Sequence, residues 1–220
     1  MTFLTHIGCL RYDRSGVAMV EFALALPFVV LVMMSAAELT NFTTTKMRVS
    51  QLALQIADNA SRIGAGTVLS NKTISEKQIN ELFTGANLQA AKLGLLTNGR
   101  IILSSLQPGA AANTYLVKWQ RCKGLKNFVS SSYFTASATE RNVVSNNPYN
   151  VSPPSDGAVM FVEISYTYQP LIGTRFQPLS EIREIAAMTV RDNRDYAGGT
   201  NGIYNSENAP VASCSTFSAS

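Results

Sequence analysis

The first forty residues of this chain include an apolar run that is long enough to cross a lipid bilayer. From Val17 to Ala37 there are 21 residues, and Glu21 is the only charged one among them. At about 1.5 Å of rise per residue, such a helix reaches about 30 Å, the thickness of the hydrocarbon core. Pro27 lies inside the run and predicts a bend, which membrane-spanning helices tolerate. The sequence therefore predicts a transmembrane helix over residues 17–37.

Glu21 is the residue that this interpretation has to explain. A carboxylate deep in a bilayer costs about 2.5–3.5 kcal/mol. One explanation starts the span at Phe22 and leaves Glu21 in the headgroup layer. The other gives Glu21 a cationic partner. Cleavage after Gly16 would create an α-amine on Val17, which lies four residues and one helical turn from Glu21. That amine would pair with Glu21 of its own chain or of a neighbouring chain.

The stretch RSGVAMVEFALALP, residues 14–27, resembles the processing site of type IV-like prepilins. In detail it resembles the TadE-like pseudopilins of the tight-adherence (Flp) pilus system. The features that carry the resemblance are a short polar leader with Gly16, an apolar helix with Glu21 at its fifth position followed by Phe22, and a downstream Leu26 with Pro27. The resemblance covers roughly residues 14–45, and the rest of the chain matches no family residue by residue.

The resemblance implies a pseudopilin or minor pilin that helps to assemble an adhesive pilus. It implies that a prepilin peptidase cuts between Gly16 and Val17, so that residues 1–16 leave as a leader peptide. Glu21 and Phe22 would then set the register of the helix against other pilin-like subunits. The implied partners are these subunits, the pilus assembly machinery, the peptidase and the bacterial inner membrane. The subunit either enters the pilus or stays in the membrane.

A second hypothesis treats the same segment as a secretory signal peptide. Arg11 and Arg14 precede the apolar run, and Ser35-Ala36-Ala37 has the small residues of a signal-peptidase site. A cut after Ala37 would release a secreted or periplasmic binding module, with residues 123–157 as its contact loop. However, the run is longer than the usual apolar region of 7–15 residues, and it carries an acid. A third hypothesis is a bitopic membrane protein that is never processed.

Flanking charges predict the orientation of the span. Arg11 and Arg14 lie closer to the apolar run than Lys46 and Arg48 do on its other side. An excess of basic residues next to a span favours the cytoplasmic side. We therefore expect a single-pass protein with a cytoplasmic N-terminus and a periplasmic C-terminal domain.

Charge and cysteine usage limit the possible functions further. The net charge is +4 with 15% charged residues, and the basic residues are scattered, so the sequence shows no nucleic-acid footprint. Of the three cysteines, Cys9 would leave with the leader. Cys122 and Cys214 would remain as a pair in an oxidising compartment, which predicts a disulfide. The alternative is two free thiols.

Apolar periodicity extends the first helix well beyond the span. The residues that recur on one helical face are Phe42, Val49, Leu52, Ile56, Ala60 and Ile63. Gly64 and Gly66 predict its end, so residues 38–63 form a helix extension. A capping box over residues 73–76 predicts the start of a second helix, which Gly85 breaks. Residues 86–93 predict a third, short helix.

Alternating patterns in the second half predict strands over residues 100–106, 114–122, 159–168 and 185–191. The first two form a hairpin around Pro108-Gly109. In the second of these strands the alternation places four side chains on one face: Tyr115, Val117, Trp119 and Arg121. Trp119 is expected in the core.

These elements predict an α+β, pilin-like fold. It has a long N-terminal transmembrane helix that continues into a small domain with short helices and an antiparallel sheet of about four strands. Residues 64–191 form this periplasmic domain, residues 123–157 are a long loop in it, and residues 192–220 are a flexible tail.

No constellation in the sequence indicates an enzyme. The one histidine, His6, lies in the predicted leader. There is no C-x-x-C, G-x-G-x-x-G or Walker motif. Two pairs of acids, Glu181 with Glu184 and Asp192 with Asp195, lack the ligand pattern of a calcium loop and are interpreted as solvated. We therefore predict no catalytic residue, metal, cofactor or small-molecule substrate.

Overall fold

The computed structural model describes residues 16–67, 69–131, 134–136, 139–142, 149, 151–173 and 181–219. The predicted leader, apart from Gly16, lies outside these residues, together with His6 and Cys9. The chain divides into two compact units. The first comprises residues 1–43 and 170–177, and the second comprises residues 44–169 and 178–220.

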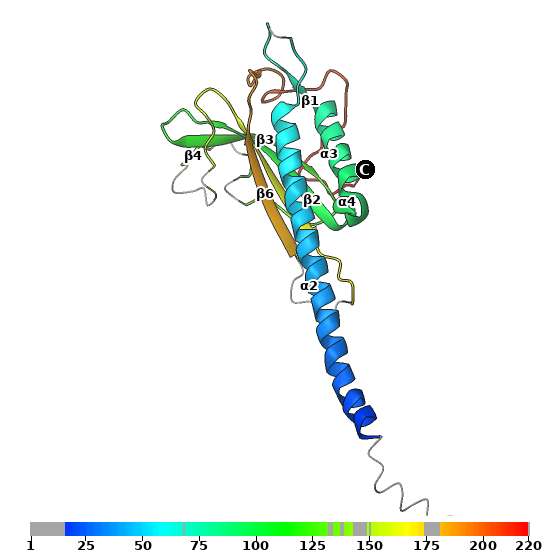
Figure 1. Cartoon of the computed structure of the whole chain (residues 1–220). Helices are drawn as coiled ribbons and strands as arrows, with labels where there is room; N and C mark the ends of the chain where they lie inside the picture. The colour runs from blue at the N-terminus through cyan, green and yellow to red at the C-terminus, as the bar shows by residue number, and fades with distance from the viewer. Residues whose placement is uncertain are drawn as a thin grey trace, which may run out of the picture. The chain divides into compact units, whose positions relative to one another are not determined.

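One helix, α2 (Val17–Arg62), runs through both units without a break (Figure 1). It ends one residue before the predicted position, which confirms the long N-terminal helix. Within the first unit, every side chain from residue 17 to residue 37 is exposed. The first unit also contains part of the connection after β5, where the backbone N–H groups of Leu171 and Ile172 donate to Glu38 Oε2 at 3.0 and 3.1 Å.

The second unit is built on an antiparallel sheet whose strand order is β4-β3-β2-β5-β6. The four long strands are β2 (Gly99–Pro108), β3 (Thr114–Lys123), β5 (Val159–Thr167) and β6 (Glu181–Thr189). A fifth strand, β4 (Arg141–Asn142), adds two residues at one edge. The predicted hairpin is confirmed, since β2 pairs with β3. The last long strand begins four residues earlier than predicted, at Glu181.

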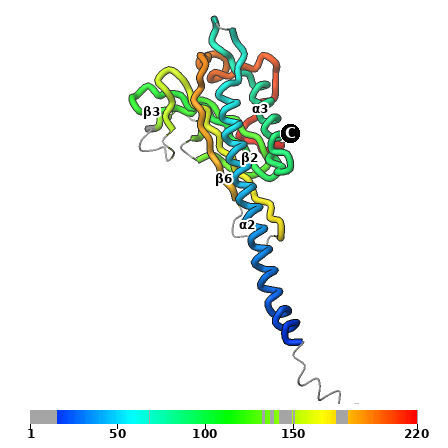
Figure 2. Tube along the Cα trace, in the orientation of Figure 1, coloured from blue at the N-terminus to red at the C-terminus, as the bar shows by residue number. Residues whose placement is uncertain are grey.

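Helices cover one face of this sheet, the helix-side face. In Figures 1 and 2, α2 crosses in front of β2 and β6, and α3 (Glu76–Ala90) runs beside it. The buried apolar residues of α2 are Val49, Leu52, Ala53, Ile56, Ala57 and Ala60. They repeat at helical spacing, as the sequence predicts. Two short turns, η1 (Ala91–Leu93) and α4 (Leu95–Asn98), connect α3 to β2.

The start of the second helix differs from the prediction. The N-cap is Ser75, whose hydroxyl accepts from the Gln78 N–H at 3.3 Å, while Gln78 Oε1 accepts from the Ser75 N–H at 3.0 Å. Thr73 instead pairs with Ala65 through two backbone bonds. The predicted box is therefore two residues too early, because Ile74 and Ser75 form strand β1, which pairs in parallel with β7 (Ile203–Tyr204).

The prediction that Gly85 breaks this helix is also wrong, because α3 continues to Ala90. A glycine inside a helix costs only about 1 kcal/mol. Burial of Phe83, Ala86 and Ala90 on either side of it offsets that cost. The predicted third helix over residues 86–93 is consequently the end of α3 and the turn η1.

The prediction that four alternate residues of β3 lie on one face of the sheet is wrong, because the strand contains a bulge. Ser105 pairs with Trp119 and the next residue, Leu106, pairs with Val117, which leaves Lys118 as the extra residue. The bulge turns the strand over, so Tyr115 and Val117 lie on the face opposite to Trp119 and Arg121. Trp119 is buried, as predicted.

The second face of the sheet, the loop-side face, has its own apolar cluster. Its buried members are Leu106, Tyr115, Val117, Phe134, Val159 and Phe161. Phe134 comes from the predicted loop and stacks on Phe161, with 4.0 Å between the ring centroids. The described part of residues 123–157 therefore supplies core to the domain.

The C-terminal segment touches the domain at several points. The backbone oxygens of Ala212 and Ser218 accept from the N–H groups of Cys122 and Gly124 at 2.9 and 2.7 Å. Arg194 is buried and donates to the Ile63 carbonyl at 2.7 Å and the Ser61 carbonyl at 3.0 Å. These contacts attach parts of residues 192–220 to the domain, and the flexibility predicted for this segment stays a prediction.

Candidate assembly site

Gly16 stands where α2 begins. Its carbonyl oxygen accepts the first helical bond, from the Val20 N–H at 3.2 Å. A Cβ atom added at Gly16 would meet nothing within 4 Å. The described part of the chain therefore gives no packing reason for glycine at this position.

Glu21 and Phe22 lie in the second turn of α2, and both side chains are exposed. The backbone nitrogen of Val17 is four residues before Glu21, one turn away along the helix. The spacing along the helix allows a charge on the Val17 nitrogen to approach the Glu21 carboxylate of the same chain.

Pro27 lies within α2, which continues through it. Proline has no N–H, so the carbonyl of Ala23 loses its helical donor. Farther along, the hydroxyl groups of Ser35 and Thr40 donate to the carbonyls of Leu31 and Ala36, each at 2.8 Å. Such bonds satisfy the polar groups of a helix internally, as a lipid environment requires. The bend predicted at Pro27 stays a prediction.

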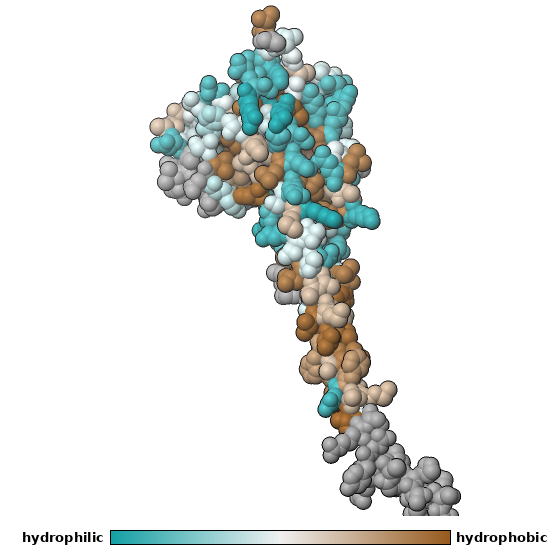
Figure 3. All heavy atoms as spheres, in the orientation of Figure 1, coloured by the Kyte–Doolittle hydropathy of each residue, from teal (hydrophilic) through white to brown (hydrophobic). Residues whose placement is uncertain are grey.

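Among the residues that the structure describes, none covers the apolar stretch of α2, whose side chains from residue 17 to residue 37 are all exposed. On the face drawn in Figure 3, hydrophobic side chains follow one another along most of the N-terminal half of α2. The helix is long and apolar enough to cross a membrane by length and composition. A helix that is apolar all round has to be buried in lipid or among other helices. This segment fits a single-pass membrane protein.

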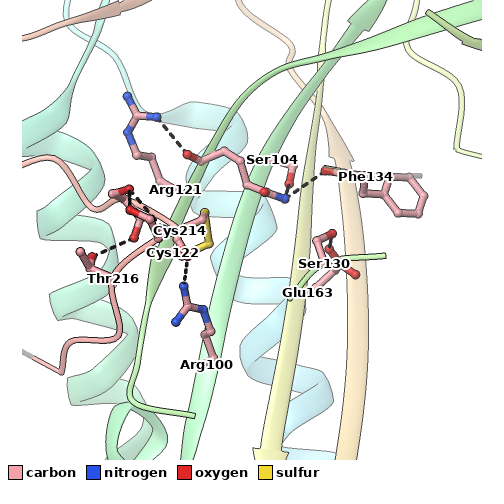
Figure 4. Close-up of a disulfide and its surroundings, with 12 residues drawn as sticks. Arg100, Ser104, Arg121, Cys122, Ser130, Phe134, Glu163, Cys214 and Thr216 are labelled. Carbon is pink, nitrogen blue, oxygen red and sulfur yellow. Dashed lines mark hydrogen bonds between the residues drawn. A yellow bond between two sulfur atoms is a disulfide. The ribbon is translucent and has the colours of Figure 1, made fainter. Parts of the chain in front are cut away.

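Cys122 on β3 and Cys214 are joined in a disulfide, with Cα atoms 4.7 Å apart across 92 residues of sequence (Figure 4). Arg100 on β2 lies beside it. One guanidinium nitrogen of Arg100 donates to the Cys214 carbonyl at 2.7 Å, and the guanidinium carbon stands 4.0 Å from the centre of the Phe217 ring. The bond and the stacked arginine hold the C-terminal segment on the loop-side face.

The comparison with protein families matches residues 16–58 to the model described as TadE-like protein. The match confirms the resemblance that the sequence shows, and it spans 43 of the 220 residues. No curated protein and no solved structure matches the chain.

The TadE-like segment contains the predicted processing site, Gly16 and Val17, the predicted register residues, Glu21 and Phe22, and Pro27, at which a bend is predicted. It also reaches into the part of α2 that packs on the sheet. The structure brings Val17 and Glu21 within one turn of each other. Cys122 and Cys214 lie in the second unit, outside the segment.

Two residues with clear structural roles were not singled out from the sequence. Glu38 binds two backbone N–H groups of a connection more than 130 residues away, and its only signal is its position directly after the apolar run. Arg194, in the predicted tail, donates to carbonyls at the end of α2, and the sequence around Arg194 gives no signal of this contact. Within the described ranges, no group of three or more His, Cys, Asp or Glu side chains could hold a metal ion.

Proposed function

We propose that this protein is a pseudopilin or minor pilin of a tight-adherence pilus, held in the inner membrane by residues 17–37. The observation that carries the proposal is the exposed apolar helix that begins directly after Gly16 and places Glu21 one turn from Val17, within residues 16–58, which match the TadE-like model. Such a helix is suited to packing among helices of the same kind. The domain would lie in the periplasm, with the N-terminus in the cytoplasm.

In this proposal a prepilin peptidase cleaves after Gly16. The new Val17 α-amine then pairs with Glu21 of a neighbouring subunit. An ion pair in lipid contributes more to alignment than to net stability, because both charges lose their hydration. Glu21 therefore sets the axial register of one helix against the next, while Phe22 and the apolar residues around it supply the packing surface.

The continuity of α2 favours this proposal over release by signal peptidase. A cut after Ala37 would sever α2 between its apolar and packed parts. It would also make Glu38, which holds two backbone N–H groups of the β5–β6 connection, the first residue of the product. Neither consequence follows from a cut after Gly16.

The decisive experiment is to determine the N-terminus of the protein from cell membranes by intact mass and terminal sequencing. We expect a start at Val17, and a Gly16→Trp variant should retain the full leader. A start at Glu38 would replace the proposal with a secreted module. An intact Met1 in the natural protein would leave an unprocessed membrane anchor and remove the partner proposed for Glu21.

A further inference from the structure

We propose that the connection after β5, residues 170–173, is a second membrane contact, in which Leu171 enters the lipid interface beside the end of the α2 span. The inference rests on the proposed membrane insertion of α2. It adds a lipid-binding surface outside the spanning helix, on a segment distant in sequence.

The first observation is position. Leu171 and Ile172 donate their backbone N–H groups to Glu38 Oε2 at 3.0 and 3.1 Å, and all three residues belong to the same compact unit. Glu38 directly follows Ala37, the last residue of the apolar run. The connection therefore lies at the level where the span ends, beside α2 in Figures 1 and 2.

The second observation is the chemistry of the exposed side chains. Leu171 is 67% exposed, and Leu39, the residue after Glu38 on α2, is also exposed. The sequence from Gln169 to Gly173, QPLIG, contains no charge. Exposure of an apolar side chain to water is unfavourable, and lipid is the nearest apolar medium for a loop that lies next to a spanning helix.

The third observation concerns the backbone. An N–H group without a partner is costly near the hydrocarbon region, because little water is available to bind it. Pro170 has no N–H, and the N–H groups of Leu171 and Ile172 are both held by Glu38. The backbone of residues 170–172 therefore has no N–H group without a hydrogen-bond acceptor. Glu38 acts as a positioning residue whose charge can stay in the headgroup layer.

The test measures the depth of residue 171 in a bilayer. The full protein is reconstituted in phosphatidylethanolamine–phosphatidylglycerol vesicles, with Cys9 changed to serine if the leader is still present. A nitroxide is attached at Leu171→Cys, at Phe28→Cys in the span, or at Leu69→Cys in the second unit. Phe28 is 71% exposed and Leu69 is fully exposed, so both accept a label without disturbing a core. Collision with oxygen reports lipid, and collision with a water-soluble nickel chelate reports water.

We expect the labels at 171 and 28 to favour oxygen and the label at 69 to favour nickel. If the label at 171 matches that at 69 while the label at 28 is in lipid, the loop inference is wrong and the membrane proposal stands. If the label at 28 is also in water, the membrane proposal fails and the inference fails with it.

Glu38 variants test the positioning role. Glu38→Ala removes the acceptor on an accessible part of α2, where alanine favours the helix. Glu38→Gln keeps an acceptor oxygen. The oxygen-to-nickel ratio at residue 171 should fall several-fold in Glu38→Ala and be preserved in Glu38→Gln. An unchanged ratio in Glu38→Ala would show that the carboxylate does not hold the loop in place.

Discussion

Glu163 is a buried carboxylate on the loop-side face of the sheet, where Ser130 Oγ donates to it. Loss of hydration raises the pKa of this carboxyl above its usual value, although Ser130, the Ser131 backbone and the charge of Arg183 act in the opposite direction. An acid with a raised pKa in the folded state favours folding when it is protonated. That contribution is complete below the ordinary pKa of 4.5 and is lost as the pH rises through the folded value.

Glu163→Gln should remove this pH dependence. We expect the free energy of unfolding of the natural protein to fall as the pH rises above about 5, and to fall less in the variant. Urea unfolding of the full chain in detergent between pH 5 and 8 measures both. Glu184→Gln, on the neighbouring strand β6, controls for the loss of a carboxylate. Equal pH slopes in the natural protein and Glu163→Gln would contradict the prediction.

The pH range matters because Glu181 acts in the opposite sense. Burial would raise its pKa, but hydrogen bonds from Arg183, Lys126 and Ser165 outweigh burial and hold the pKa at about 2. Its contribution to stability is therefore present above the ordinary pKa of 4.5 and is lost as the pH falls toward 2. Measurements above pH 5 leave this residue ionised in both states.

Phe134 tests whether the long loop is part of the core. Its ring is completely buried between Tyr115, Tyr149 and Phe161. Phe134→Ala should lower the free energy of unfolding by about 3–5 kcal/mol, because it leaves a cavity on the loop-side face. Val129→Ala, at an exposed position in the same loop, should change it by no more than about 0.5 kcal/mol. Similar small losses in both variants would show that the loop does not cover the sheet.

At the scale of elements, the end of α2 depends on a residue from the other end of the chain. The last carbonyls of a helix lack internal donors. Arg194 supplies donors to the carbonyls of Ser61 and Ile63, where a cation also complements the helix dipole. Arg194→Met keeps most of the buried volume and removes the donors. It should destabilise the domain by about 1–3 kcal/mol.

The same unfolding experiment measures that loss, with Arg191→Met at an exposed neighbouring position as the control. A second reading is hydrogen exchange of the last turn of α2, which should accelerate in Arg194→Met alone. Unchanged exchange and stability would mean that solvent caps the helix equally well.

The Cys122–Cys214 bridge is the second element-scale attachment. It closes a loop of 92 residues in sequence separation, so its loss should cost about 2–5 kcal/mol. Cys214→Ser and reduction of the natural protein should lower the unfolding midpoint to a similar level. Adding reductant to Cys214→Ser should have no further effect. If reductant does not change the unfolding midpoint of the natural protein, the two cysteines are not bridged in the protein made by the cell.

The elements that could be predicted from sequence are those whose pattern is local. The buried stripe of α2 repeats at helical spacing, and the apolar residues Met160, Val162 and Ile164 alternate along the sequence of β5, so both elements were predictable. The start of α3 could not be predicted, because the sequence offers two capping boxes, one beginning at Thr73 and one at Ser75. Pairing of Ile74 and Ser75 with β7 decides between them. The bulge at Lys118 leaves no local signal, since only the partner strand defines the register.

The candidate site was predictable for a different reason. Gly16, Glu21 and Phe22 are exposed, so their arrangement depends on spacing along one helix and on no distant packing. The contacts of Glu38 and Arg194 could not be predicted, because each joins segments more than 130 residues apart.

At the scale of the whole molecule, the proposal predicts a separation between folding and assembly. Glu21→Ala should be made, processed after Gly16, inserted and oxidised normally, because the Glu21 side chain is exposed and lies in the first unit, away from the disulfide of the second. It should be absent from assembled pili or assembly complexes, while Glu21→Asp retains part of the activity. Cross-linking of subunits in membranes, together with pilus yield, measures this. Normal pilus formation by Glu21→Ala would overturn the assembly role.

The contacts of the C-terminal segment can form only late in synthesis of the chain. The cap on α2, the β1–β7 pairing and the disulfide each join a residue before position 123 to one beyond position 190. At about 5–20 residues per second, the ribosome adds Arg194 roughly 7–26 s after Arg62. During that interval these three attachments cannot form. A chain that stops before residue 194 lacks all three of them, and we expect it to be more sensitive to proteases than the full chain.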